Sequence, residues 1–209
     1  MKFTYATDGS GTVTGTYTFA SAGVYKMKLT VTDCAPCAAA DRTSISADSI
    51  DGLDVTIVIY DPTAGFVTGG GWIMSNPGAY TIDPSLSGKA NFGFVSKYQK
   101  GATKPTGETE FQFKAGGLNF HSTSYDWLVV SGPMAQYKGT GTINGAGNYQ
   151  FLLTGRDGKQ SGGGGADGFR LKITDGTAVI YDNMISADDS ITTSNVQVLG
   201  GGSVQIQAK

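Results

Sequence analysis

The chain has 209 residues, of which 15% are charged and 32 are glycine, and its formal net charge is -2. No long run of Lys or Arg is present, which argues against a nucleic-acid partner, because such proteins need a basic surface to displace counterions. No apolar stretch approaches the ~20 residues of a membrane helix, so no membrane span is expected. The glycines lack the three-residue period of collagen, and the length suits one large or two small domains.

Apolar and polar residues alternate through the first part of the chain, which predicts strands at 17–19, 25–31 and 55–60. The sequence Asp61-Pro62-Thr63 then indicates a break, because proline lacks a backbone donor. We therefore expect a first unit of residues 1–60 and a second of 61–209. The opening MKFTYATDGSG turns polar at once, unlike a signal peptide, so the signal of an exported parent would lie upstream.

Cys34 and Cys37 lie in one C-A-P-C segment, for which three interpretations compete. A local disulfide would fit an oxidising compartment. A redox pair would normally need a βαβ context, which the sequence does not suggest. A zinc half-site would need further ligands, and the one histidine, His121, is far away in the sequence. The following stretch, 38–50, has room for one or two helical turns at most.

The alternation restarts after the break and predicts a second series of strands. These strands are expected at 66–73, 90–98, 108–114, 118–120, 127–129, 137–143, 149–153, 169–173, 179–181 and 204–206. Asn144-Gly145, Asp157-Gly158 and Asp175-Gly176 suit type I′ hairpin turns, and the glycine run at 162–165 predicts a hairpin tip or mobile loop. No segment longer than about ten residues has a helical period with caps. The sequence thus predicts an all-β chain, whose second unit is an antiparallel β-sandwich of jelly-roll-like or meander form.

Residues 17–33 carry the pattern Y-x-F-x-x-x-G-x-Y-x-x-x-L-x-V-x-D. This segment resembles the second half of a PKD domain, a family with an immunoglobulin-like sandwich fold. The family's W-D-F-G-D-G signature is reduced here to Asp8-Gly9, and its first strands would precede Met1. The resemblance implies an incomplete PKD-like sandwich at 1–60, with the Tyr25 hydroxyl bonded back to the main chain at a corner.

The segments 65–73, 90–98, 111–113, 118–125 and 139–145 resemble a C-terminal domain that recurs after PKD repeats in bacterial secreted proteins. This resemblance covers about 70% of the chain. It implies an extracellular or cell-surface location within a multidomain protein, and it assigns no catalytic role or ligand.

Aromatic residues are the first candidates for ligand binding. Tyr125 and Trp127 lie two apart in the sequence, so we expect them to share one sheet face, where their rings and His121 would contact a sugar. Further candidates are Trp72, Tyr80, Tyr98 and Tyr137. The alternative is that these rings fill the sandwich core, because aromatic side chains dominate cores.

Acidic residues beside glycine-rich loops are candidate calcium ligands. Asp157 and Asp167 flank the glycine loop, while Asp182 and Asp188 lie in a second polar segment. Calcium takes six to eight oxygen ligands from carboxylates, carbonyls and water. The alternative is ordinary turn chemistry, in which Asp side chains bond their own backbone.

The sequence gives little support for a catalytic site. His121 has Ser122, Ser124 and Asp126 nearby, but the alternating directions of strand side chains oppose a triad. Glu108 and Glu110 are expected on one face of a strand with suitable spacing for a glycosidase pair, yet nothing suggests the cleft that such a pair needs.

The sequence therefore predicts a non-enzymatic extracellular module for structure or adhesion. The alternatives are a carbohydrate-binding module that uses surface aromatics, and a homo-oligomer or filament in which a strand from one chain completes the first unit of another. An enzyme is the least favoured hypothesis. The sequence assigns no cofactor, and calcium is the one candidate.

Overall fold

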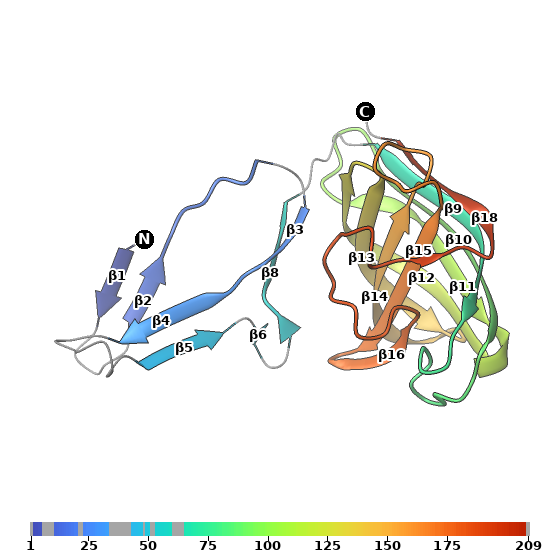
Figure 1. The fold of residues 1–209 in the computed structure, drawn as a ribbon, viewed down its shortest axis with the longest axis horizontal. Coiled ribbons are helices and arrows are strands. Elements are labelled where there is room, and N and C mark those ends of the chain that lie inside the picture. Colours follow the sequence, from blue (N-terminus) through green and yellow to red (C-terminus); the bar gives the residue numbers. More distant parts are fainter. Residues whose placement is uncertain are drawn as a thin grey trace.

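The computed structural model describes residues 2–5, 11–20, 23–33, 43–47, 49–50, 53–59 and 65–207, and their fold is all-β (Figure 1). The strands of the first part are β1 (Lys2–Tyr5), β2 (Gly11–Thr14), β3 (Gly23–Lys26), β4 (Leu29–Asp33), β5 (Thr43–Ala47), β6 (Ser49–Ile50), β7 (Leu53–Asp54) and β8 (Thr56–Ile59). Those of the second part are β9 (Phe66–Ser75), β10 (Gly88–Tyr98), β11 (Pro105–Phe113), β12 (Leu118–Ser131), β13 (Met134–Ile143), β14 (Ala146–Arg156), β15 (Gly168–Asp175), β16 (Ala178–Asp182), β17 (Gln197–Val198) and β18 (Gly201–Gln207). A short 3-10 helix, η2 (Lys114–Gly116), precedes β12.

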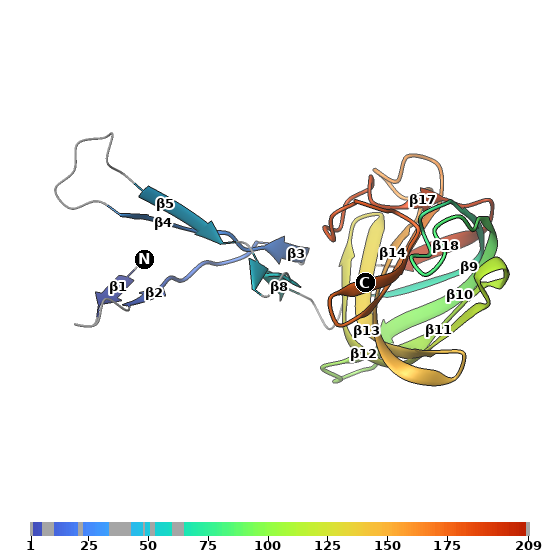
Figure 2. The ribbon, with the colours of Figure 1, turned by 90° about the horizontal axis from the view of Figure 1, so that it is seen from below.

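The second part is one ten-stranded antiparallel sheet whose order is β16-β15-β14-β13-β12-β11-β10-β9-β18, with β17 paired to β15. Strands β9 to β16 follow one another in the sequence and in the sheet, so they form a meander. The C-terminal strand, β18, pairs with β9 at one edge of this meander. Figure 2 shows the sheet curling around its own core. This confirms the predicted antiparallel sandwich.

Alternate residues of these strands point inward and form an aromatic core, as the period of two predicted. Thr109, Phe111 and Phe113 of β11 are at most 1% exposed. The rings of Phe92 on β10 and Phe169 on β15 stack with their centroids 3.9 Å apart. This contact joins strands that lie far apart in the sheet order, so the core holds the curled sheet together.

A buried hydroxyl network crosses this core. The Thr109 hydroxyl lies 2.8 Å from the hydroxyls of both Tyr125 and Tyr137, and the Ser122 hydroxyl accepts a hydrogen bond from the Thr109 amide. On the other side of the core, the Tyr181 hydroxyl donates to Ser75 Oγ at 3.0 Å. Burial raises the pKa of all three tyrosines above the ordinary 10.0.

Raising the pH above ~10 is therefore expected to unfold the second part. A tyrosine whose pKa is raised in the folded state contributes stability that is complete below its pKa in the unfolded chain and falls as the pH rises above that value. Each of the three tyrosines then lowers the free energy of unfolding by up to ~1.36 kcal/mol per pH unit. Tyrosinate absorbance and circular dichroism, followed together, should show these rings ionising only as the β signal is lost. Ionisation of all ten tyrosines with the β signal intact would contradict this expectation.

The strands of the first part pair only in twos among the described residues: β1 with β2, β3 with β8, β4 with β5, and β6 with β7. None of these described strands pairs with the large sheet, and both the boundary near residue 60 and the PKD-like sandwich stay predictions. The ring of Tyr25 lies over Gly23, where an added Cβ would be 3.2 Å from the ring. The predicted hydrogen bond from its hydroxyl to the main chain stays a prediction.

In the stretch 38–50, the described residues form β5 and β6, while Cys34, Cys37, residues 38–42 and residue 48 lie outside the described residues. Two of the three predicted turn positions need correction. Asn144-Gly145 is a two-residue turn with positive φ at both positions, as predicted. Asp157-Gly158 instead begins a long connection from β14 to β15, and the hairpin after Asp175 turns on Gly176 and Thr177.

The described part of the chain contains no helix with the length and apolar character needed to cross a membrane.

Candidate functional site on the outer face of the sheet

A row of side chains crosses the outer face of four neighbouring strands. Trp127 of β12 pairs with Lys138 of β13, which pairs with Leu152 of β14, which pairs with Lys172 of β15. Directly paired residues lie on the same face of a sheet. The row therefore places an aromatic ring beside a cationic side chain on the face opposite the core.

A pocket of about 370 Å³ lies over this row. Its polar lining comes mainly from Gln136, Lys138, Gln150, Lys172 and Asp189, while Trp127, Leu152 and Val24 of β3 contribute apolar surface. Small-molecule sites commonly have volumes of about 300–1,000 Å³ and a few convergent polar groups. The pocket thus has the size and composition of a site for one or two sugar rings or a similar ligand.

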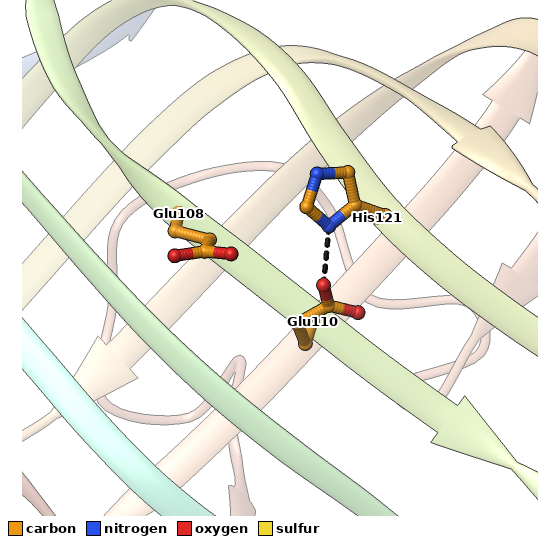
Figure 3. Close-up of side chains that lie close together, drawn as sticks. All are labelled: Glu108, Glu110 and His121. Atoms are coloured by element: carbon orange, nitrogen blue, oxygen red, sulfur yellow. Dashed lines mark hydrogen bonds and ion pairs between the residues drawn. The ribbon is translucent and has the colours of Figure 1, made fainter. Parts of the chain in front are cut away.

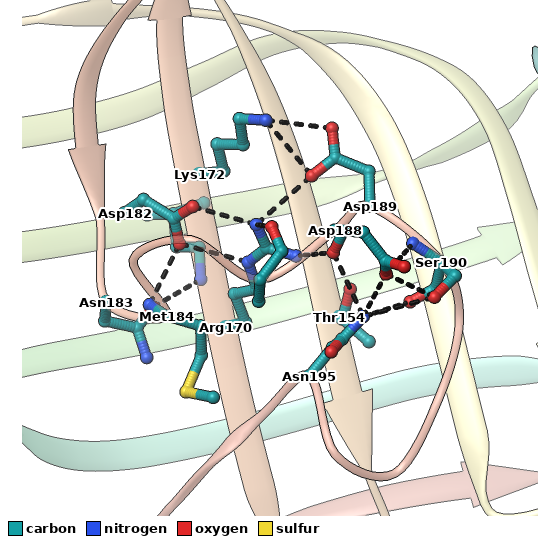
Figure 4. Close-up of polar contacts among 12 residues, drawn as sticks. Thr154, Arg170, Lys172, Asp182, Asn183, Met184, Asp188, Asp189, Ser190 and Asn195 are labelled. Atoms are coloured by element: carbon teal, nitrogen blue, oxygen red, sulfur yellow. Dashed lines mark hydrogen bonds and ion pairs between the residues drawn. The ribbon is translucent and has the colours of Figure 1, made fainter. Parts of the chain in front are cut away.

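The connection from β16 to β17 forms one wall, and a fully buried arginine fixes it in place (Figure 4). Arg170 donates to both carboxylate oxygens of Asp182 at 3.0 and 2.8 Å, and to the carbonyls of Ala187 and Asp188. Its third carboxylate contact is Asp189 Oδ1 at 3.1 Å. Burial lowers the pKa of Arg170, but the hydrogen bond and charge of Asp182, together with Asp189, outweigh burial and raise it.

Two pocket residues continue this network. Lys172 donates to both oxygens of Asp189 at 3.1 and 2.9 Å. Gln136 is fully buried and donates through Nε2 to Thr154 Oγ1 and to the Asp189 carbonyl. Asp189 is thus occupied by protein donors on its side chain and its backbone.

Two polar groups of the pocket remain free. Gln136 Oε1 is buried and has no hydrogen-bond partner among the described residues. The ammonium of Lys138 has no hydrogen bond or ion pair within that same part of the chain. The buried Gln136 acceptor is costly without a donor, whereas the Lys138 ammonium is available to a ligand in the pocket.

Comparison of the chain with known protein families, curated proteins and solved structures finds no match. The two resemblances noted from the sequence therefore stay predictions, and the geometry of the site has to carry the functional argument.

Tyr125 and Trp127 do not share a sheet face, which corrects the prediction. The register of β12 against β13 shifts between Ser122 and Ser124 and again between Tyr125 and Trp127, so Thr123 and Asp126 are extra residues. A β-bulge of this kind reverses the direction of every following side chain. Tyr125 is consequently 7% exposed in the core, while Trp127 lies half-buried on the outer face.

Glycine is required opposite this irregularity. A Cβ at Gly139, which pairs with Tyr125, would lie 2.0 Å from the Ser124 carbonyl and 2.9 Å from the Phe151 ring. The bulge and the packing of Phe151 therefore both depend on a residue without a side chain at this position.

The other aromatic candidates are divided between the core and the surface. Tyr137 is fully buried in the core, and Tyr80 and Tyr98 pack against it. Trp72 is half-buried on the outer face of β9, where Lys89 Nζ lies 4.7 Å from the centre of its ring. Neither tryptophan is a core residue, and Trp127 alone among these aromatics lines the pocket.

The four predicted calcium ligands lie in two separate places and have protein donors. Asp157 accepts from the amides of Lys159 and Ile206, and Asp167 from those of Gly158 and Val204. Asp182 binds Arg170, and Asp188 accepts from Ser190 and Asn195. These contacts are the turn and network chemistry that the sequence left as the alternative, and calcium binding at these residues stays a prediction.

His121 is on the outer face of β12 and contacts the Glu110 carboxylate, away from the Trp127 pocket. Ser122 points into the core, so it does not meet this histidine in the way a catalytic nucleophile would. Sequence reasoning did find the shared face of Glu108 and Glu110, but it missed their meeting with His121. The missing signal was the register of β11 against β12, which pairs Glu110 with His121.

Proposed function

We propose that this chain is a non-enzymatic extracellular module that binds a polysaccharide through the outer-face pocket around Trp127. The observation that carries the proposal is the half-buried Trp127 ring in a pocket of about 370 Å³, beside Lys138, whose ammonium has no ion pair among the described residues. The extracellular location rests on the sequence resemblance to domains of secreted bacterial proteins. Binding of this kind would serve adhesion of a larger protein to a glycan surface.

The chemistry of the pocket suits a sugar. An aromatic ring covers the apolar C–H face of a pyranose, and the polar groups around it bond to the hydroxyls at the ring's edge. Lys138 and Gln150 would donate to hydroxyl or carboxylate oxygens of the sugar. These groups come from strands β12 to β14 of one rigid sheet, so binding requires little ordering of the protein.

Binding without hydrolysis is favoured by the acidic groups present. Glycosidases need two carboxyl groups about 5–9.5 Å apart on either side of the scissile bond. Asp189 is the one carboxylate that lines the pocket as described, and Lys172 and Arg170 already neutralise it. The pocket therefore lacks a free general acid and a free nucleophile.

Trp127→Ala is expected to weaken binding of the strongest polysaccharide found on a glycan array by about five- to tenfold, because an aromatic platform contributes about 1–1.4 kcal/mol. Binding would be measured by calorimetry, and thermal melting would show that the variant is folded. Trp72→Ala is the matched control, because this second tryptophan is also half-buried on the outer face but lies outside the pocket. Equal affinity of the two variants, or no glycan bound by the parent chain, would reject the proposal.

A further inference from the structure

A second group of chemically active side chains lies on the outer face, away from the Trp127 pocket. Glu108 and Glu110 occupy alternate positions of β11, and Thr109 between them points into the core at 1% exposure. His121 of β12 is paired directly with Glu110. Two strands therefore bring three potential metal ligands to one spot, as Figure 3 shows.

The ligand atoms converge. One nitrogen of His121 and one oxygen from each of Glu108 and Glu110 all lie within 4.8 Å of one another. His121 already contacts Glu110 through Nδ1, and Figure 3 shows the Glu108 carboxylate on the same side of the sheet. Their side chains are partly exposed, 48% for His121 and 42% for Glu110, so an ion from solvent can reach them.

The negative charges of the two glutamates are only partly balanced by side chains of the described residues. Carboxylates two positions apart on one strand face repel each other. Within the described ranges, no Lys or Arg forms an ion pair with either glutamate, and Glu110 has only His121. An ion pair with His121 explains the position of Glu110 but leaves Glu108 without a cation.

We propose that Glu108, Glu110 and His121 form a binding site for a divalent transition-metal ion, for which zinc is the best match. Zinc binds imidazole nitrogen at about 2.0–2.1 Å and carboxylate oxygen at about 2.0–2.2 Å, in sites with three protein ligands and an open fourth position. The imidazole favours zinc over calcium, which requires six to eight oxygens. Ligands of one tetrahedral zinc ion lie roughly 3.4 Å apart, so small rotations of these exposed side chains would close the site.

The proposed zinc site lies on two central strands and is separate from the Trp127 pocket. Its three residues belong to β11 and β12, and none of them lines the Trp127 pocket. A zinc ion here would cross-link two central strands of the sheet, and its open position would remain available to a ligand atom from solvent or from a partner. Its presence does not depend on the proposed polysaccharide binding.

Zinc titration by calorimetry tests the site, with the full chain carrying Cys34→Ser and Cys37→Ser so that thiolates do not bind the metal. We expect one zinc ion per chain and a rise in melting temperature, since the ion binds the folded state. Glu108→Gln and His121→Ala should each weaken zinc binding by at least about tenfold. Asp175→Asn is the matched control, because this carboxylate is exposed at the end of β15 and lies outside the group.

The Glu108→Gln variant decides between a metal site and a simple ion pair. This substitution keeps the size of the side chain and the contact of Glu110 with His121, but it removes the third ligand. Zinc affinity that equals that of the Asp175→Asn control would overturn the proposal, as would the absence of saturable zinc binding by the cysteine-free chain.

Discussion

Asp182→Ala is expected to lower the free energy of unfolding by about 3–5 kcal/mol, because it leaves a buried guanidinium without its bidentate partner. Arg170 is fully buried, and both of its contacts with the Asp182 carboxylate are at 3.0 Å or less. Asp182 also accepts from the Met184 amide at 2.9 Å. The substitution therefore removes three hydrogen bonds and leaves the buried guanidinium with Asp189 as its remaining carboxylate partner (Figure 4).

Chemical denaturation with two independent probes would measure this loss, and Asp175→Ala, at an exposed strand end, is the control. The double variant Arg170→Met and Asp182→Leu should be less destabilised than Asp182→Ala alone, because it removes both charges together. A loss below about 1 kcal/mol in Asp182→Ala would mean that solvent reaches Arg170 and that the pair does not hold the loop.

The same network couples stability to the proposed binding site. Arg170 binds the carbonyls of Ala187 and Asp188, and Lys172 holds the Asp189 side chain. These contacts position the pocket wall that Asp189 contributes. Loss of the network would loosen this wall, whereas Trp127→Ala would remove a binding surface and leave the wall intact.

Local periodicity was enough to predict most strands and their inward faces. In β10, Phe92 and Phe94 lie at alternate positions and are buried as predicted, and Phe111 and Phe113 of β11 follow the same pattern. Alternation succeeds here because one face of each strand packs on a core and the other meets water. Asn144-Gly145 was predictable for a different reason, since its turn requires positive φ at both residues.

The site depended on features that local patterns do not encode. The two bulges of β12 reverse the faces of Tyr125 and Trp127, and an alternating sequence gives no sign of where an extra residue is inserted. Arg170 was not singled out, because its burial follows from pairing with Asp182 across β15 and β16 and from the overlying loop. Glu110 and His121 meet only through strand register, which is a long-range property.

Replacing both Asp157 and Asp167 by alanine is expected to destabilise the second part by about 3 kcal/mol or more and to make it associate. These carboxylates accept from the Ile206 and Val204 amides of β18 at 3.1 and 2.9 Å, and Gln160 Nε2 donates to the Ile206 carbonyl. Among the strands described, β18 pairs only with β9, and so it is an edge strand of the large sheet. The glycine-rich connection thus caps an edge that would otherwise be open to another strand.

The two parts of this expectation have separate causes and separate measurements. Hydrogen bonds to a charged acceptor contribute about 1.5–3 kcal/mol each, so denaturation should show the loss of stability. The amides freed at alternate positions of β18 could donate hydrogen bonds to a strand of a second molecule. Light scattering after gel filtration should therefore show dimers or larger species. Asp83→Ala is the control, because among the described residues the Asp83 side chain bonds only to Ser85 in its own turn. A double variant that stays monomeric and as stable as this control would show that β18 needs no cap, which would leave the role of the two aspartates open to the calcium hypothesis.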